Sequence, residues 1–432
     1  MKRTILRALR NRNYKFFFIG QGISLVGTWM TRVATSWLVY RTTHSPILLG
    51  VVSFTGQIPA FLIAPWAGVL IDRWNLHRIL VVTQVLAMVQ SLLLAALTLS
   101  GLINIPQILA LSIFQGLING FDMPARQSFM IEMIENKSDL GNAIALNSSI
   151  VNGARMIGPS IAGILIAISG EGMCFLIDGI SYIAVIIALC SMNVKSQTRK
   201  ISGNLLEGFR EGLDYVFGFH PIRAILLLLG LISFMGMPYT VLMPIFAARF
   251  PGGGPHLLGF LMGASGLGAL TAGIYLAARD SVRGLGKWLP FSSALFGGSL
   301  IAFALSQYLW LSFFVVFFVG FGMMMEMASS NTILQTIADD NKRGRVMSFY
   351  TMSFTGMVPF GSLFAGFFAH RIGASNTLII GGAVCLVGAA VFLRELPKIR
   401  ELIRPIYIRK GIVQATISGV QTAASLTVPP EG

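Results

Sequence analysis

The stretch from Gly68 to Arg78, GVLIDRWNLHR, interrupts a long apolar run with an acid, two arginines and a histidine. The apolar pattern resumes at once in the next residues, Ile79-Leu-Val-Val82. A short charged segment between two apolar runs of about 20 residues is typical of the connection between two membrane-spanning helices. The stretch therefore predicts that the chain turns here at a membrane surface.

The composition supports this interpretation along the whole chain. Of the 432 residues, 54% are hydrophobic and 11% are charged, whereas soluble domains carry about 25% charged residues. We expect an all-α integral membrane protein with room for about a dozen helices and no separate catalytic domain. The net charge of +15 does not indicate a nucleic-acid partner, because the basic residues lie in short segments between apolar runs. The three cysteines lie inside apolar runs and predict no disulfide framework.

Apolar runs of sufficient length predict twelve transmembrane helices. They lie near residues 16–40, 47–71, 79–100, 105–125, 143–168, 172–192, 222–248, 257–278, 288–306, 309–330, 346–370 and 374–393. The predicted domains are a six-helix bundle (1–193), a cytoplasmic linker with an amphipathic helix (194–221), a second six-helix bundle (222–394) and a basic, partly disordered cytoplasmic tail (395–432). The linker helix lies either on the membrane surface or packed against the protein.

The distribution of basic residues predicts the orientation. Both terminal segments and the even-numbered connections, with their helix edges, hold 27 of the 32 Lys and Arg residues, and the opposite connections hold three. Because Lys and Arg accumulate on the cytoplasmic side, both termini are expected in the cytoplasm. The remaining two, Arg32 and Arg155, lie inside predicted helices.

An internal repeat links the two predicted bundles. A shift of 203 positions lays residues 141–163 over residues 344–366 and aligns five small residues: Gly141, Gly153, Gly158, Ala162 and Gly163 with Gly344, Gly356, Gly361, Ala365 and Gly366. A two-fold repeat of six helices is typical of secondary transporters, which hold the substrate between the two halves.

The charged stretch between the second and third helices resembles the major facilitator superfamily signature, Gly-x-x-x-Asp-Arg/Lys-x-Gly-x-Arg-Arg/Lys. The matching residues are Gly68, Asp72, Arg73 and Arg78. Asn75 stands in place of a glycine, where we expect it to adopt the left-handed turn, and His77 stands in place of a basic residue. The resemblance implies that this loop closes the cytoplasmic side during part of a transport cycle; a simple topological anchor is the alternative.

A second motif, Gly153-Ala-Arg-Met-Ile-Gly-Pro-Ser-Ile-Ala-Gly163, resembles the glycine-proline motif in the fifth helix of the superfamily's antiporters, which implies export. Here Gly153, Gly158 and Gly163 are expected to allow close helix packing, and Pro159 to bend the helix. Asn11–Phe18, Gly27–Met30, Phe121–Gln127 and Asn142–Asn147 extend the similarity to the enterobactin-exporter and drug-antiporter branch, the transmembrane secretion effectors.

Five ionisable residues fall within predicted spans, where an ionised side chain costs about 2.5 to 3.5 kcal/mol. Arg155 lies near the middle of the fifth helix and shares one face with Asn152. Arg32 and Asp178 lie at similar depths in helices 1 and 6, which predicts a contact between them. We assign Arg32, Asn152, Arg155 and Asp178 to the substrate and proton pathway; a permanent structural ion pair is the alternative for Arg32 and Asp178.

Asp122 and Glu326 lie near the cytoplasmic ends of helices 4 and 10, at nearly equivalent places in the two halves. Arg126 follows Asp122 by one helical turn, a spacing at which opposite charges meet. We therefore assign Asp122, Arg126 and Glu326, with Gly68, Asp72, Arg73 and Arg78, to a cytoplasmic gate. A proton-carrying role for the two carboxylates is the alternative.

The sequence holds no G-x-x-x-x-G-K-[ST] motif for ATP and no histidine pattern for a metal. We predict no enzyme activity and no cofactor, with the proton gradient as the energy source. The predicted function is proton-coupled export of small amphipathic molecules such as siderophores or drugs, by a monomer in a bacterial inner membrane, with the lipid bilayer as a further partner. Two alternatives are movement of lysolipids or metabolites, including uptake, and a transport-inactive sensor or scaffold.

Overall fold

The structure is a computed structural model that describes residues 7–134, 139–192, 205–279, 281–340 and 342–412. The side chains of residues 64–65, 68–69, 72–73 and 205–209 lie outside this description. The described chain is helical and contains no strand, which confirms the predicted all-α class.

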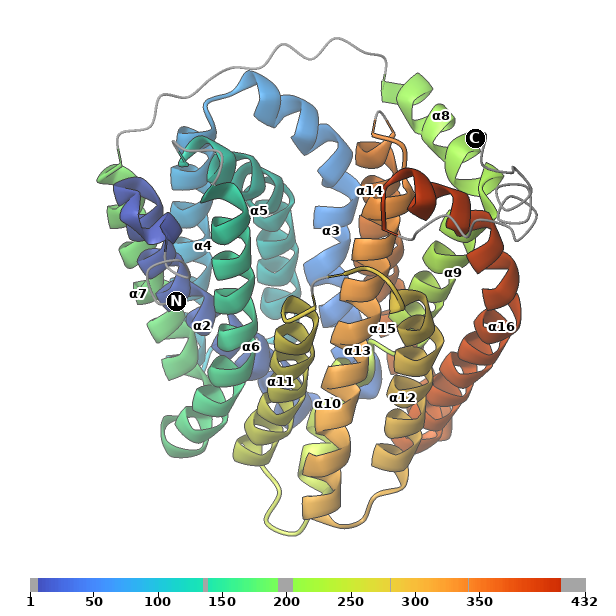
Figure 1. Ribbon diagram of the computed structural model, residues 1–432. Helices are drawn as coiled ribbons and strands as arrows, with labels where there is room; N and C mark the ends of the chain where they lie inside the picture. Colours follow the sequence, from blue (N-terminus) through green and yellow to red (C-terminus); the bar gives the residue numbers. More distant parts are fainter. Residues whose placement is uncertain (1–6, 135–138, 193–204, 280, 341, 413–432) are drawn as a thin grey trace, which may run out of the picture.

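The helices fall into two sets joined by a linker helix (Figure 1). The first set contains η1 (Arg7–Arg10), α2 (Arg12–Thr43), α3 (Pro46–Arg73), α4 (Leu76–Leu99), α5 (Ile105–Glu132), α6 (Leu140–Ser169) and α7 (Glu171–Cys190). The linker helix is α8 (Leu205–Gly218). The second set contains α9 (His220–Met235), α10 (Tyr239–Arg249), α11 (Pro255–Ala277), α12 (Leu285–Leu305), α13 (Leu309–Ile337), α14 (Arg343–Thr351), the π-helix η3 (Met352–Gly356), α15 (Met357–Ile372) and α16 (Ala374–Arg409).

All twelve predicted spans are helical. Eleven segments of the described chain are long and apolar enough to cross a membrane. The twelfth is α2, which has 32 residues but carries polar side chains such as Gln21 and Arg32 along its length. Since an intramembrane polar residue faces the bundle interior or a water-filled space, the polarity of α2 marks it as a helix that lines the functional site.

Polar caps set the starts of several helices, including the one after the charged stretch. Asn75 is the N-cap of α4, with φ −69° and ψ 111°, and its side chain accepts a hydrogen bond from the Arg78 backbone N–H at 3.1 Å. The predicted left-handed turn at Asn75 is therefore wrong. A capping asparagine satisfies a free N–H of the first turn, and this role needs extended backbone.

The two sets of helices meet through two equivalent glycine contacts. A Cβ on Gly163 of α6 would lie 2.9 Å from the Cα of Gly259 in α11, and a Cβ on Gly366 of α15 would lie 3.0 Å from the Cα of Gly50 in α3. Gly163 and Gly366 are aligned by the predicted repeat, so the two contacts are related by the internal symmetry. In lipid, where helices gain little from burying apolar surface against each other, such small residues allow the close packing that holds helices together.

The same symmetry relates contacts inside each set. A Cβ on Gly158 would meet the Trp29 side chain of α2 at 2.6 Å, and a Cβ on Gly361 would meet the Phe234 carbonyl of α9 at 2.1 Å. A Cβ on Gly153, the third glycine assigned to packing in α6, would have open space within 4 Å. Gly158 and Gly163 thus lie at helix contacts, whereas Gly153 does not.

The seventh and eleventh spans are interrupted near their middles. The predicted helix 222–248 is two helices, α9 and α10, which are separated at Gly236-Met237-Pro238. The eleventh span contains the π-helix η3, which ends at Gly356, and the ring of Phe61 from α3 lies 2.4 Å from the position of a Cβ there. Breaks and π-bulges free backbone groups and occur often at functional sites.

The linker helix α8 packs on the second set of helices. Glu211 forms an ion pair with Arg345 of α14. The Tyr215 hydroxyl donates to a carboxylate oxygen of Asp339 at 3.1 Å, and the Lys342 ammonium lies 4.7 Å from the Tyr215 ring centroid. Of the two alternatives for the linker helix, these contacts favour packing against the protein.

The last helix is longer than predicted. Instead of ending near residue 393, α16 continues to Arg409, through Pro397 and Pro405. Leu396, Ile399 and Ile403 are buried along one face of this extension, so it is a packed element rather than a loose tail. Residues 413–432 of the predicted tail lie outside the described residues.

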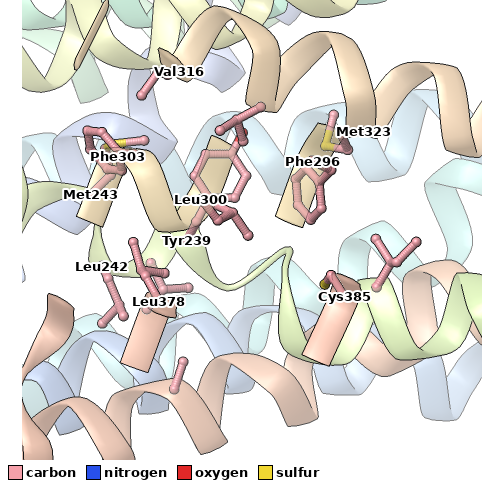
Figure 2. Close-up of a cluster of buried hydrophobic side chains, with 14 of the residues drawn as sticks. Tyr239, Leu242, Met243, Phe296, Leu300, Phe303, Val316, Met323, Leu378 and Cys385 are labelled. Atoms are coloured by element: carbon pink, nitrogen blue, oxygen red, sulfur yellow. The ribbon is translucent and has the colours of Figure 1, made fainter. Parts of the chain in front are cut away.

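A buried apolar cluster joins the broken seventh span to its neighbours in the second set (Figure 2). The ring centroids of Tyr239 and Phe296 are 6.2 Å apart, at the start of α10 and in α12. A Cβ on Gly236 would lie 2.1 Å from the Phe296 ring, so the break between α9 and α10 leaves the room that this ring fills. This packing fixes the position of Tyr239.

Candidate functional site

Two intramembrane arginines meet over one tryptophan ring. The Arg32 guanidinium carbon lies 4.8 Å from the Trp29 ring centroid, and that of Arg155 lies 5.4 Å from the same centroid. Trp29 and Arg32 belong to α2, and Arg155 belongs to α6. Arg32 is exposed and Arg155 is partly exposed, and among the described residues neither forms an ion pair with a carboxylate.

Residues of the second set complete this group. An Arg155 nitrogen donates to the Met323 sulfur of α13 at 3.4 Å, and Arg155 interacts electrostatically with Tyr239 of α10. The Tyr239 hydroxyl is 2.7 Å from the Ser265 hydroxyl of α11. We name Trp29, Arg32, Arg155, Tyr239 and Met323 the arginine cluster; it lies where the two sets of helices meet.

Asn152 lies one turn before this cluster on α6. Its side-chain amide donates to the Ser148 carbonyl at 2.9 Å, within its own helix. The part of Asn152 in the substrate pathway stays a prediction.

Asp178 of α7 is buried among hydroxyl groups. One carboxylate oxygen accepts from Thr31 at 2.8 Å and from Ser91 at 2.6 Å. The other oxygen has no hydrogen-bond partner among the described residues and lies 2.7 Å from the position of a Cβ on Gly27. The glycine at position 27 thus provides the space for this carboxylate against α2.

The predicted contact between Arg32 and Asp178 is wrong. Thr31, the neighbour of Arg32 in α2, binds Asp178, while Arg32 lies over Trp29. Successive residues of a helix point about 100° apart, so Thr31 and Arg32 cannot both face α7. Similar depth in the membrane did not determine which face of α2 each side chain occupies.

Asp122 of α5 lies inside the first set of helices. One carboxylate oxygen accepts from Thr83 at 2.9 Å and from the Gln84 amide at 2.7 Å, both on α4. The other oxygen forms an ion pair with Arg126, the predicted partner one helical turn away. Asp122 is therefore a buried carboxylate with a compensating cation.

Glu326 of α13 has a matching environment without a cation. One carboxylate oxygen accepts from Ser292 at 2.9 Å and Ser293 at 3.0 Å, two consecutive residues of α12. The other accepts from Ser330 at 3.2 Å, one turn further along α13. Two other titratable side chains, Tyr350 and Cys385, interact electrostatically with Glu326, and neither can carry a positive charge.

Of the assigned gate residues that the structure describes, Asp122 and Glu326 do not share an ionic cluster. Asp122 and Glu326 each bind partners in their own set of helices. Arg78 is exposed at the start of α4, and His77 bonds the Leu189 carbonyl at 2.8 Å. The structure does not describe the surroundings of Gly68 or the side chains of Asp72 and Arg73. The cytoplasmic gate therefore stays a prediction.

Several residues of the site were not predicted from the sequence. Trp29 carries a usable signal, because an aromatic ring one turn from an arginine can form a cation–π contact. Tyr239 follows Gly236-Met-Pro238, and a Gly/Pro interruption of an apolar run is a known pointer to a transporter binding site. The serines around Glu326 carry no such signal, because single serines are common on helix contacts in membranes.

Comparison with known proteins gives the same family for nearly the whole chain. Residues 4–406 match the model of a family described as transmembrane secretion effector. The chain is 25% identical over 389 residues to the staphyloferrin A transporter of Staphylococcus aureus, covering 89% of this chain and 97% of that protein. It is 24% identical to the multidrug efflux pump Tap of Mycolicibacterium fortuitum, covering 87% and 93%, and 20% identical to macrolide efflux protein A of Streptococcus pyogenes, covering 90% and 98%.

Solved structures share the fold. A bacterial homologue of the human lysosomal transporter Spinster, in an inward-facing and unoccupied conformation, has a TM-score of 0.69 at 13% identity, covering 90% of this chain and 98% of that chain. A POT peptide transporter in complex with alafosfalin has a TM-score of 0.72 at 13% identity, covering 90% and 95%. Because the family model spans residues 4–406, the chain belongs to the transmembrane secretion effector family of major facilitator superfamily transporters.

Proposed function

We propose that this chain is a proton-coupled exporter of small amphipathic molecules with an anionic or catecholate-like group, of the siderophore or drug class. It works by alternating access in a bacterial inner membrane, with both termini in the cytoplasm. The observation that carries the proposal is the arginine cluster, in which two uncompensated guanidinium groups share the Trp29 ring between the two halves.

Electrostatics favours an anionic ligand at this cluster. The two guanidinium carbons lie 4.8 Å and 5.4 Å from one ring centroid and hence within about 10 Å of each other. At that separation two like charges repel by about 2 kcal/mol near a protein surface, which is comparable with the gain of about 0.5 to 2 kcal/mol from one cation–π contact. An anion between Arg32 and Arg155 removes this repulsion, whereas a cationic drug adds to it.

The relatives support export and the substrate class. The chain is similar over 87 to 90% of its length to a staphyloferrin A transporter and to macrolide and multidrug efflux proteins. An aromatic ring and a methionine sulfur in the arginine cluster supply the adaptable apolar contact that an amphipathic substrate needs. Among these relatives, the siderophore transporter agrees best with the positive charge of the cluster.

The packing of the two halves supports alternating access. The cross-half glycine contacts, such as Gly163 with Gly259, lie toward the helix ends farthest from the linker helix α8, which is the outer side in the proposed orientation. On the linker side, Gly141 and Gly153 of α6 have open space within 4 Å of a Cβ position. This arrangement is the one expected of a transporter that is closed to the outside and open to the cytoplasm.

Proton coupling requires a carboxylate that can change its protonation state. Asp122 forms an ion pair with Arg126, whereas Glu326 receives only hydroxyl donors and has no basic neighbour among the described residues. A hydroxyl can donate to an ionised carboxylate or accept from a protonated one, so the serines around Glu326 suit both states. We assign the proton to Glu326, with Asp178 as a second protonation site in the first half.

Transport by the purified protein in vesicles tests this function. We expect a panel of siderophores and dyes, added to vesicles with an imposed proton gradient, to include anionic members that move against their gradient with proton counterflow. Arg155→Gln should reduce this transport at least tenfold. Arg371→Gln, which alters an arginine at the far end of α15 whose guanidinium lies 5.5 Å from the Phe367 ring, is the matched control and should transport normally.

Two outcomes would contradict the proposal. Transport of lysolipids or neutral metabolites with unchanged activity in Arg155→Gln would place the substrate outside the arginine cluster. If no transported substrate caused protons to move, transport would not be coupled to protons, and the protein would be a passive carrier.

A further inference from the structure

A cavity of about 390 Å³ opens at the linker side of the second set of helices, remote from the arginine cluster. Its wall combines apolar and basic side chains from α9, α13, α16 and the segment that leads into α12. The apolar part is formed by buried residues, among them Ile225, Leu289, Ile333, Leu396 and Ile399. The cavity is thus built into the packed helices and is not a dip between loops.

The basic residues of the cavity come from two segments far apart in the sequence. Arg283 lies in the turn before α12, and Lys287 lies in the first turn of α12. Arg400 and Arg404 lie in the extension of α16. All four are exposed, and no carboxylate lines the cavity among the described residues. The site therefore presents the basic side chains of Arg283, Lys287 and Arg400 over an apolar floor.

Neighbouring aromatic residues place the cavity at the membrane–water boundary. The Trp288 ring lies 5.3 Å from the Tyr275 ring and 5.2 Å from the Phe291 ring. Trp and Tyr gather at the headgroup level of membranes. Phe291 of α12 and Leu393 of α16 are exposed beside the cavity, at 55% and 57%, which gives hydrocarbon chains an apolar surface to follow.

We propose that this cavity binds an anionic phospholipid of the cytoplasmic leaflet. The phosphate lies among Arg283, Lys287 and Arg400, the glycerol backbone fills the cavity, and the acyl chains leave it along α12 and α16. A soluble phosphate compound would not use the apolar floor, and a zwitterionic lipid would bring its ammonium group close to Arg283, Lys287 and Arg400. Basic pockets between helix ends on the cytoplasmic side are suited to anionic headgroups.

Such a lipid would add a polar bridge between helices that already pack through apolar side chains. The extension of α16 is tied to α13 by Lys410, whose ammonium donates to the Thr336 carbonyl at 2.8 Å, and to α9 by a contact of 3.3 Å between His220 and Glu395. A phosphate that binds Arg283 and Arg400 together adds a bridge from α12 to α16. We therefore expect the lipid to stabilise the second set of helices.

The test uses the purified full chain in detergent with added phosphatidylglycerol, phosphatidylcholine or inorganic phosphate. We expect phosphatidylglycerol alone to remain bound in native mass spectrometry and to raise the melting temperature. In the double variant Arg283→Gln/Arg400→Gln, its affinity should fall about 30-fold, which corresponds to about 1 kcal/mol for each basic residue. Both side chains are exposed, so the lipid-free melting temperature should match that of the parent protein.

The matched control is Arg394→Gln/Lys398→Gln, which removes two exposed charges from the same helix outside the cavity. It should bind phosphatidylglycerol like the parent protein. Equal losses in the two double variants would assign the binding to general surface charge and overturn the proposal. So would equal effects of phosphatidylcholine, or an equal effect of inorganic phosphate, which would identify an anion site without a lipid. None of these outcomes depends on transport activity, so the proposed function is tested separately.

Discussion

Glu326 occupies in α13 the place that Asp122 occupies in α5, but Ser330 stands one turn after Glu326 where Arg126 stands one turn after Asp122. Each carboxylate accepts hydrogen bonds from two consecutive residues of the preceding helix, Thr83 and Gln84 in one half and Ser292 and Ser293 in the other. The two halves thus share the acid and its two hydrogen-bond donors, but only the first half has a cation one turn further along the helix.

This difference predicts opposite effects of neutralising the two acids. In Glu326→Gln we expect the protein to fold and to exchange substrate across vesicle membranes, but to lose transport driven by a pH gradient, because the amide cannot take up and release a proton. The measurement is active efflux compared with substrate exchange at equal pH on both sides. Gradient-driven efflux that survives in Glu326→Gln would move the coupling to Asp178.

Adding the missing cation should have the same consequence by a different route. Ser330→Arg reproduces the arrangement of Asp122 and Arg126, in which the carboxylate is paired with a cation one helical turn away. We expect gradient-driven efflux to be lost and the pH dependence of the remaining exchange to flatten. Ser330→Ala is the control: it removes one of three hydroxyl donors and should retain coupling.

Asp122→Asn should act on stability. The substitution leaves the Arg126 guanidinium without its ion-pair partner inside the first set of helices. A hydrogen bond to a charged group contributes about 1.5 to 3 kcal/mol, so we expect a clearly lower melting temperature in detergent. A melting temperature equal to that of the parent would show that the pair does not stabilise the fold.

The glycine contacts between the halves predict a conformational effect. In Gly259→Ala, the new methyl carbon would lie 2.3 Å from the Pro159 carbonyl oxygen, so α6 and α11 must separate at that level. We expect spin labels on these helices to report a larger outer separation and a smaller inner one. Gly153→Ala is the control, because open space surrounds that position; it should leave the distances unchanged.

The cap of α4 predicts a graded loss of stability at position 75. Asn75→Ala removes the side-chain oxygen that binds the Arg78 backbone N–H and should cost about 1 kcal/mol, whereas Asn75→Gly should cost only a few tenths. Thermal unfolding of the two variants measures the difference. Equal melting temperatures for alanine and glycine at this position would contradict the capping role.

Apolar run lengths were sufficient to predict the helical spans, because the bilayer sets the length of each helix. They did not predict the break before Tyr239, because run length alone takes no account of Gly236 and Pro238 inside an otherwise continuous apolar run. The sequence likewise predicted which charged residues lie inside the membrane, but it did not predict the residues that they contact. The faces of α2 and α7 depend on how two helices are rotated against each other, and for Arg32 the prediction from depth alone was wrong.

Trp29 binds both arginines from within the first half, while Tyr239 and Met323 approach Arg155 from the second. In the proposed alternating access the halves tilt relative to each other, so the two arginines would move together with Trp29 while their contacts with Tyr239 and Met323 change. A bound anion would accordingly stay with the first half through the whole conformational change. Contacts from the second half would control its release.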